Sequence, residues 1–207
     1  MDGTLCHSRQ DATPKMLQEL NRINEKHKIF IVSGAEMSRM LKQVPLTYTT
    51  YFTQNGNVIY DGDKIIRQNE LENKMEILEH INLLKKDYPN AEVEDRGSEL
   101  VVSFTGFTAP QNIKDKFDPD RKIRMEMLRK YPHPNAYVAG LTGIDYIPKT
   151  KGENIRHYLE LRKIKPTDCL YIGDALESGA NDATVVGIIP TFAVKNPEET
   201  LKFLKQL

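Results

Sequence analysis

The sequence predicts an α/β fold: a doubly wound, open parallel sheet forms the core, and a smaller α+β segment is inserted into it. Near both ends of the chain, short apolar runs that stop at Ser-Gly or Gly-Asp alternate with amphipathic helical segments. Such runs are typical of parallel strands, which are buried on both faces. In the middle, the order changes to helix, strand, strand, repeated twice, which indicates a separate layer. The predicted domains are a core of residues 1–67 and 148–207 and an insertion of residues 68–147.

In the first core segment, apolar residues at helical spacing, with Pro14 in the first turn, predict a helix. The apolar run closed by Ser33-Gly34 predicts a buried strand. Gln54-Asn55-Gly56 is a turn signal between two further strands. The predicted elements are a helix at 11–27, a strand at 28–34, a helix at 36–44 and paired strands within 49–60.

The insertion begins with a long amphipathic pattern that includes Met75 and Leu78 and ends before Pro89. Arg96-Gly97-Ser98 indicates the turn of a hairpin. In order, we expect a helix from residue 70, strands at 91–95 and 99–104, a helix at 118–131 and strands at 135–139 and 143–147. The core then resumes with a helix at 153–161, strands at 168–173 and within 187–194, and a helix at 197–207.

Composition excludes several classes of function. Lys+Arg and Asp+Glu both number 29, so the net charge is zero and gives no reason to expect nucleic acid or an anionic membrane as partner. No apolar stretch approaches the roughly 18 residues of a membrane span. No basic-then-apolar leader opens the sequence, and Cys6 and Cys169 have no metal-type spacing. We therefore expect a cytoplasmic protein with two buried, reduced thiols, and the oligomeric state stays open.

Polar residues stand where four core segments end, which is the edge at which open parallel sheets bind ligands. Singly, each piece has an ordinary explanation as a turn or a solvated charge. Carboxylates, however, suit Mg²⁺, and a hydroxyl, a lysine and loop N–H groups suit the oxygens of a phosphoryl group. Together the pieces indicate a phosphoryl-transfer site. They are Asp2-Gly3-Thr4, Ser33-Gly34, Lys149-Thr150-Lys151-Gly152 and the run from Gly173-Asp174 to Asn181-Asp182.

In their order and residue types, the four pieces resemble motifs I to IV of the haloacid dehalogenase (HAD) superfamily of aspartate-nucleophile phosphohydrolases. The resemblance covers nearly the whole chain. Gln54-Asn55-Gly56 and the spacing from Gly173-Asp174 to Asn181-Asp182 look most like the type IIB branch, which includes phosphomannomutase-like enzymes and sugar-phosphate phosphatases. The resemblance implies a Rossmann-like core with a C2-type α+β cap, inserted after the second motif at residues 68–147.

The resemblance also implies roles for individual residues. Asp2 would be the general acid/base, Ser33 would hydrogen-bond the phosphoryl oxygens, and Lys151 would neutralise charge between the phosphoryl group and the nucleophile. The cofactor would be Mg²⁺, with ligands Asp2, Asp174, Asn181 and Asp182. Substrate contacts are expected from Gly3, Thr4, Gly34, Asn55 and, in the cap, Arg96.

Two departures from the family pattern matter. The family's first motif is Asp-x-Asp-Gly-Thr after an apolar strand, and Met1 stands at the second of these positions. The nucleophilic aspartate and the first strand are therefore expected just upstream of Met1 and are absent from this chain. Lys151 follows Pro148 by three residues instead of about five, so Lys149 is an alternative for the lysine of the third motif.

Three functions stay open. The first is a Mg²⁺-dependent phosphatase that acts on a small phosphorylated metabolite, most simply a sugar phosphate. The second is a phosphomannomutase-like mutase, which is disfavoured because Gly106 is followed by Phe107 where that branch usually has Arg. The third is a truncated or inactive protein that binds phosphorylated ligands. A basic cluster in the cap is interpreted as a solvated helix face; it comprises Lys114, Lys116, Arg121, Lys122 and Arg124.

Two expectations concern the sheet and the cap. Without its first strand, the core sheet should contain an apolar slot between the strands at 28–33 and 168–173, and each of these should have an unpaired edge. The chain should then either have low stability or pair with another sheet edge through this gap, and it should bind Mg²⁺ weakly. Connections near residues 61–68 and 146–149 are expected to act as hinges for closure of the cap.

Overall fold

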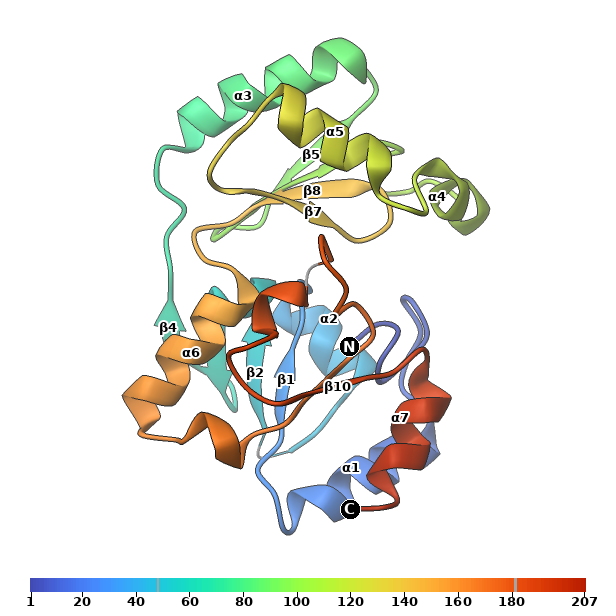
Figure 1. The fold of residues 1–207 in the computed structure, drawn as a ribbon, viewed down its shortest axis with the longest axis vertical. Coiled ribbons are helices and arrows are strands. Elements are labelled where there is room, and N and C mark those ends of the chain that lie inside the picture. The colour runs from blue at the N-terminus through green and yellow to red at the C-terminus, as the bar shows by residue number, and fades with distance from the viewer. Residues whose placement is uncertain (48, 181) are drawn as a thin grey trace. The chain divides into compact units, whose positions relative to one another are not determined.

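The computed structural model describes residues 1–47, 49–180 and 182–207. These residues divide into two compact units (Figure 1). The first unit comprises Met1–Gln68, Lys149–Glu177 and Asp182–Leu207, and the second comprises Asn69–Pro148 with residues 178–180. The divisions after Gln68 and Pro148 lie one residue beyond the expected ends of the insertion.

The first unit has the predicted α/β character, with parallel strands between helices. Strand β1 (Phe30–Val32) pairs in parallel with β2 (Thr50–Thr53). Strand β9 (Tyr171–Gly173) pairs in parallel with β10 (Thr191–Ala193). The helices of this unit are α1 (Pro14–Asn24), α2 (Met37–Gln43), α6 (Lys151–Arg162) and α7 (Pro197–Leu204).

The core sheet of the first unit is in two pieces. One piece has the order β1-β2-β3-β4 and the other contains β9 and β10. Among the described residues, β1 and β9 therefore each hydrogen-bond through one edge only. This confirms the expected gap between the strands at 28–33 and 168–173, because these two strands do not pair with each other.

A β-hairpin occupies one of the connections that we expected to act as a hinge. Strand β3 (Val58–Asp61) pairs antiparallel with β2 and with β4 (Lys64–Gln68). Gly62 lies in the tight turn between them, with a φ of 63° that favours glycine. The prediction of a pliable connection over residues 61–68 is wrong, because the ladder of β3 and β4 fixes this segment.

The second unit contains a four-stranded antiparallel sheet with the order β5-β6-β8-β7. Its strands are β5 (Glu92–Asp95), β6 (Leu100–Ser103), β7 (Ala136–Ala139) and β8 (Gly143–Tyr146). Its helices are α3 (Lys74–Asp87), α4 (Gln111–Phe117) and α5 (Lys122–Lys130). Helices α3 and α5 cover the same face of the sheet (Figure 1). The expected order of elements is present, and α4 is an addition that periodicity did not indicate.

The core of the second unit corrects two sequence interpretations. The face of α3 that packs on the sheet contains Ile77, Ile81 and Leu84, whereas Met75 is 72% exposed. The basic cluster is not uniformly solvated, because Lys114 and Arg124 are buried. The Arg124 guanidinium pairs with Asp118 and donates to backbone carbonyls of the β7–β8 turn.

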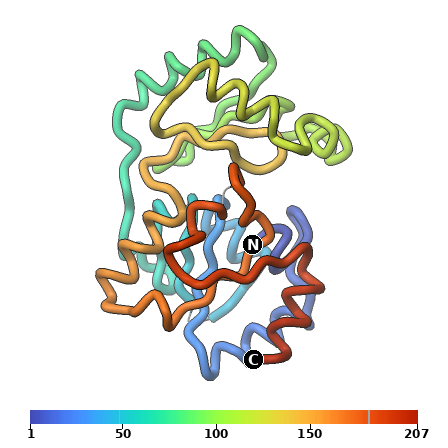
Figure 2. The backbone as a smooth tube through the Cα atoms, viewed as in Figure 1, coloured from blue at the N-terminus to red at the C-terminus, as the bar shows by residue number. Residues whose placement is uncertain are grey.

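The polypeptide termini and thiols belong to the first unit. The C-terminus lies beside α1, where Arg22 donates to the carbonyl of Leu204 (Figure 2).

Cys6 is buried, and burial, with the Asp2 charge adding to it, raises the pKa of its thiol to about 11. Cys169 is partly exposed, so the expectation of two buried thiols is correct only for Cys6. No helix in the described part of the chain is both long and apolar enough to cross a membrane.

Candidate active site

The carboxyl ends of β1 and β9 bring together residues that are far apart in the sequence. Ser33 follows β1, and Asp174 follows β9. The hydroxyl of Thr4 donates to Asp174 Oδ1 at 2.6 Å, which joins the first and last of the four predicted pieces. Because parallel strands end at a common edge, we expected the four pieces to lie close together, and this hydrogen bond brings the first and last of them into contact.

Gly3 is required at the point where the first and last pieces touch. Its φ is 75°, a left-handed backbone conformation that glycine adopts without strain. A Cβ atom at this position would collide with the carboxylate of Asp174. The loop after Asp2 can therefore approach Asp174 only because residue 3 has no side chain.

Lys151 and Asp182 form a buried ion pair in the same region. Their side chains are only 4% and 7% exposed, and the Lys151 ammonium donates to Asp182 Oδ1. Burial alone would lower the pKa of Lys151, but its contacts with Tyr171 and Asp182 outweigh that effect and raise it. Burial likewise opposes ionisation of Asp182, and Lys151 holds the pKa of that carboxyl below its usual range. Its partners therefore favour the ammonium form of this buried lysine.

The start of α6 decides which lysine occupies the site. Thr150 caps the helix through its hydroxyl, which accepts from the backbone N–H of Glu153, and the Glu153 carboxylate accepts from the N–H of Thr150. Lys151 is thus the first residue of the helix. A Cβ atom on the next residue, Gly152, would overlap the carbonyl oxygen of Thr184, so this close approach requires glycine. Of the two candidates, the structure places Lys151 in the site, whereas Lys149 is half-buried.

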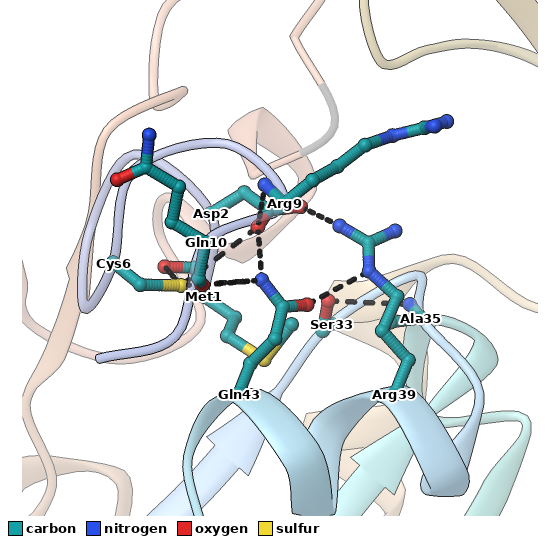
Figure 3. A network of polar contacts seen from close by, with 9 residues as sticks. All are labelled: Met1, Asp2, Cys6, Arg9, Gln10, Ser33, Ala35, Arg39 and Gln43. Carbon is teal, nitrogen blue, oxygen red and sulfur yellow. Dashed lines mark hydrogen bonds and ion pairs between the residues drawn. The ribbon is translucent and has the colours of Figure 1, made fainter.

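Asp2 is held by a polar network from α2 (Figure 3). Arg39 forms an ion pair with Asp2 Oδ2. Gln43 donates to Asp2 Oδ1 at 3.1 Å and accepts from Arg39 Nε at 2.7 Å. Sequence analysis missed both residues, although their spacing of four places them on one face of the helix that follows Ser33-Gly34. The network fixes the orientation of the Asp2 carboxylate.

Ser33, Gly34 and Asn55 form a second small group at the end of β1. Ser33 Oγ accepts from the N–H of Ala35 at 3.2 Å, and the Ser33 carbonyl accepts from the N–H of Asn55 at 2.8 Å. Asn55 has a φ of 59° and is buried. Asn154 of α6 donates to the Asn55 carbonyl at 3.0 Å. The turn Gln54–Gly56 is therefore tied to both β1 and α6, and Asn154 is a residue that sequence analysis did not identify.

The described carboxylates do not form a ready metal site. The α-amino group of Met1 is buried; burial lowers its pKa, Lys151 adds to this, and the charges of Asp182, Asp174 and Asp2 oppose it. Two of these three acids, Asp2 and Asp182, are paired with the basic side chains of Arg39 and Lys151. Among the residues that the structure describes, no three His, Cys, Asp or Glu side chains are grouped to hold an ion. The predicted ligand Asn181 lies outside the described residues, and Mg²⁺ binding stays a prediction.

Arg96 belongs to the second unit and lies in the turn between β5 and β6. Its guanidinium donates to Glu94 Oε2 at 2.7 Å and to Glu99 Oε1 at 3.2 Å. Glu99 is fully buried. Two carboxylates therefore already neutralise Arg96 within its own unit, and its predicted role in binding a substrate anion stays a prediction.

The chain is similar to phosphomannomutases over almost its full length. Over 230 residues, the chain is 27% identical to a phosphomannomutase from Solanum lycopersicum, and the match covers 98% of this chain and 89% of that protein. It is similarly 25% identical to a phosphomannomutase from Arabidopsis thaliana, over all of this chain and 94% of that protein.

Solved structures share the fold at lower sequence identity. An IMP-bound IMP-nucleotidase from Plasmodium falciparum superposes with a TM-score of 0.69 at 17% identity, over all of this chain and 66% of that one. A trehalose-6-phosphate phosphatase related protein gives 0.62 at 20% identity, over 99% of this chain and 93% of that one. The family model of haloacid dehalogenase-like hydrolases matches residues 1–133, well over half of the chain. On this match, the chain belongs to the haloacid dehalogenase-like hydrolases.

Proposed function

We propose that this chain provides the core and cap of a Mg²⁺-dependent phosphohydrolase that acts on a small phosphorylated metabolite, most simply a sugar phosphate. The observation that carries the proposal is the buried Lys151 ammonium, which is paired with Asp182. A buried ammonium group next to a phosphoryl group would strongly stabilise its oxygens during transfer. The solved structures with a similar fold include two named for phosphomonoester substrates, which supports this class of reaction.

Each residue of the site has a proposed part in this reaction. An aspartate joined to the Met1 nitrogen would be the nucleophile and would form an aspartyl-phosphate. Asp2, oriented by Arg39 and Gln43, would transfer the proton to the leaving group and from the attacking water. Ser33 and the loop N–H groups near Gly34 would contact the phosphoryl oxygens. Asp2 and Asp174 would hold Mg²⁺, which would neutralise charge on the phosphoryl oxygens when bound.

A phosphomutase is the second candidate, favoured by the phosphomannomutases to which the chain is similar over almost its full length. A mutase moves a phosphoryl group within a sugar and depends on a sugar bisphosphate for continued turnover. The measurement that separates the two is the release of inorganic phosphate from a hexose monophosphate, with and without added hexose bisphosphate. Stoichiometric phosphate release without the bisphosphate supports the phosphatase.

The test compares two extended versions of the chain that differ only in the side chain of the residue joined to Met1. In both, Lys-Ile-Ile-Val-Phe precedes a variable residue joined to Met1, which is Asp in one version and Asn in the other. We expect the Asp version to hydrolyse p-nitrophenyl phosphate in millimolar Mg²⁺ and the Asn version to lose at least 100-fold in rate, because it has no nucleophile. Asp174→Asn should cause a comparable loss, and Lys149→Met should not. Equal activity of the Asp and Asn versions would contradict the proposed mechanism.

A further inference from the structure

The two carboxylate oxygens of Asp2 have different partners (Figure 3). Oδ1 accepts from Gln43 Nε2 and from the backbone N–H of Arg9, both at 3.1 Å, and the Cys6 thiol lies 3.8 Å from it. Amide N–H groups can only donate, so these contacts use Oδ1 as an acceptor. Oδ2 pairs instead with the guanidinium of Arg39. Oδ2 is therefore the oxygen that the proposed proton transfer would use, and Arg39 occupies it in this structure.

The ion pair of Arg39 with Asp2 is open to solvent, unlike the buried pair of Lys151 with Asp182. The side chains of Arg39 and Asp2 are 37% and 32% exposed. An ion pair that water reaches contributes little to stability, because both charges are well solvated when they separate. A phosphate group offers a guanidinium several charged acceptor oxygens, whereas Asp2 presents one to Arg39. Arg39 can therefore exchange Asp2 for a phosphate group, while Lys151 stays with its buried partner.

Gln43 is a fixed anchor for the guanidinium of Arg39. Its Oε1 accepts from Arg39 Nε at 2.7 Å. Gln43 is buried; its Nε2 also donates to the carbonyl of Gln10 at 2.7 Å, and its own carbonyl accepts from the N–H of Ala12 at 2.8 Å. These contacts hold Gln43 whether or not Arg39 pairs with Asp2. The guanidinium can therefore turn toward another anion while Nε stays bound to Gln43.

Two donors of residues 33–39 have hydrogens that no described residue accepts. Nη1 of Arg39 has no hydrogen-bond partner in the part of the chain that the structure describes, and Figure 3 shows one terminal nitrogen of Arg39 directed away from Asp2 and Gln43. The Ser33 hydroxyl accepts from the N–H of Ala35, so its own hydrogen is left for another acceptor. Both donors suit the oxygens of an anion.

From these observations, we infer that Arg39 is a phosphate-binding residue that exchanges Asp2 for the phosphoryl group when a phosphomonoester binds. Nη1 and Nη2 then bind two phosphoryl oxygens, and Nε stays on Gln43 Oε1. The exchange frees Asp2 Oδ2, so the acid/base becomes available only when a substrate is present. The use of the freed oxygen rests on the proposed function, whereas the binding of phosphate by Arg39 does not.

The first experiment measures the binding of inorganic phosphate to the 207-residue chain by ³¹P NMR titration, without Mg²⁺, so that it needs no catalysis. Arg39→Met should raise the Kd by about tenfold or more, because it removes the charge and both terminal donors. The matched control is Arg22→Met, since Arg22 belongs to the same unit, is 39% exposed and pairs with Glu19. It should leave the Kd unchanged.

Arg39→Lys separates the charge from the paired donors. Lysine keeps the positive charge but has no planar fork, so the Kd for phosphate should rise less than in Arg39→Met. Circular dichroism checks that each variant is folded, and Arg39→Lys decides the question if Arg39→Met is not. An unchanged Kd in the folded Arg39 variants, or an equal rise in Arg22→Met, would overturn the inference.

The second experiment uses the extended version with Asp joined to Met1 and p-nitrophenyl phosphate as substrate. If Arg39 binds the phosphoryl group, Arg39→Met should raise KM by about tenfold or more, and Arg39→Lys should recover part of this loss. If Arg39 only orients Asp2, kcat should fall while KM stays unchanged, and this result would overturn the inference. Absence of any phosphatase activity would count against the proposed function alone, because the phosphate titration decides the role of Arg39 separately.

Discussion

The ammonium of Lys151 is paired with the carboxylate of Asp182, 31 residues away, in an interior where neither side chain is more than 7% exposed. Two features bring them together. The Thr150 cap starts α6 at Lys151, and Gly152 allows that helix to approach the carbonyl of Thr184. The pair therefore depends on the packing of α6 against the segment after Asp182 as much as on the two charges.

Lys151→Met should destabilise the chain by about 3–5 kcal/mol, because the substitution leaves the Asp182 charge buried and unpaired. The free energy of unfolding in urea measures this effect. Lys149→Met is the matched control, and it should change stability by less than about 0.5 kcal/mol. The double variant Lys151→Met with Asp182→Asn should recover part of the loss, and no recovery would argue against the ion pair as its cause.

Arg124→Met should destabilise the second unit by a similar amount, about 3–5 kcal/mol. Arg124 is 1% exposed, pairs with Asp118 and donates to the carbonyls of Ala139 and Gly140. Lys122→Met is the control on the same helix, because its pair with Asp120 is exposed to solvent. The free energy of unfolding in urea, followed by far-ultraviolet circular dichroism, measures the stability loss of each variant. An equal loss in Arg124→Met and Lys122→Met would contradict the prediction that the buried Arg124 contributes more to stability.

Gly3→Ala should cost more stability than Gly62→Ala. Both glycines have positive φ values, 75° and 63°, so alanine brings about 1–2 kcal/mol of backbone strain at either position. At Gly62 the added methyl group meets no atom within 4 Å, whereas at Gly3 it collides with Asp174. We expect a further loss of about 1–3 kcal/mol at Gly3 from this overlap. Equal losses in urea unfolding would mean that Asp174 can move away freely.

Stability should rise with pH up to about 6.5 because of His133. Burial, with the neighbouring His80 adding to it and Glu76 opposing, lowers the pKa of His133 below its ordinary 6.5. Between the two pKa values the unfolded chain binds more protons than the folded one, so the free energy of unfolding increases with pH and levels off above about 6.5. Urea unfolding from pH 5 to 8 measures the slope.

The control for this slope is an exposed histidine of the first unit. His133→Asn should flatten the pH dependence, and His157→Asn should leave it unchanged. The environment of His133 explains the contrast: its ring lies 4.9 Å from that of His80, which is itself hydrogen-bonded to the Tyr146 hydroxyl at 2.8 Å. A slope that persists in His133→Asn would assign the effect to other groups.

Hydrophobic periodicity predicted most of the elements because burial on one face leaves a local pattern. The strand at 28–34 and the helix at 11–27 are present as β1 and α1 with shorter ends. Strand β4 was missed because Lys64 and Ile65 are exposed and its middle is only partly buried, so no alternation marks it. Its formation depends on pairing with β3 across the turn at Gly62, which a sequence pattern does not encode.

The basic cluster of the cap shows that a local sequence pattern also fails to predict which charged side chains are buried. Alternating acidic and basic residues on a helix usually indicate a solvated face, and Lys122 fits that rule with 81% of its side chain exposed. Arg124, two positions away, is turned inward, because Asp118 and the carbonyls of the β7–β8 turn satisfy its donors. Whether a charge can be buried depends on its partners, and these come from distant parts of the chain.

By itself, the sequence determined the α/β class, the position of an inserted sheet-and-helix segment and the family motifs at the ends of core strands, because chain order and local patterning carry these properties. The resemblance to the family also predicted the gap beside β1, because the family's first motif follows a strand of the core sheet. Only the tertiary structure decided that Lys151 pairs with Asp182, that Arg39 and Gln43 hold Asp2, and that Arg96 is neutralised within its own unit. These contacts form between side chains that lie within a few ångströms of each other only after the chain has folded.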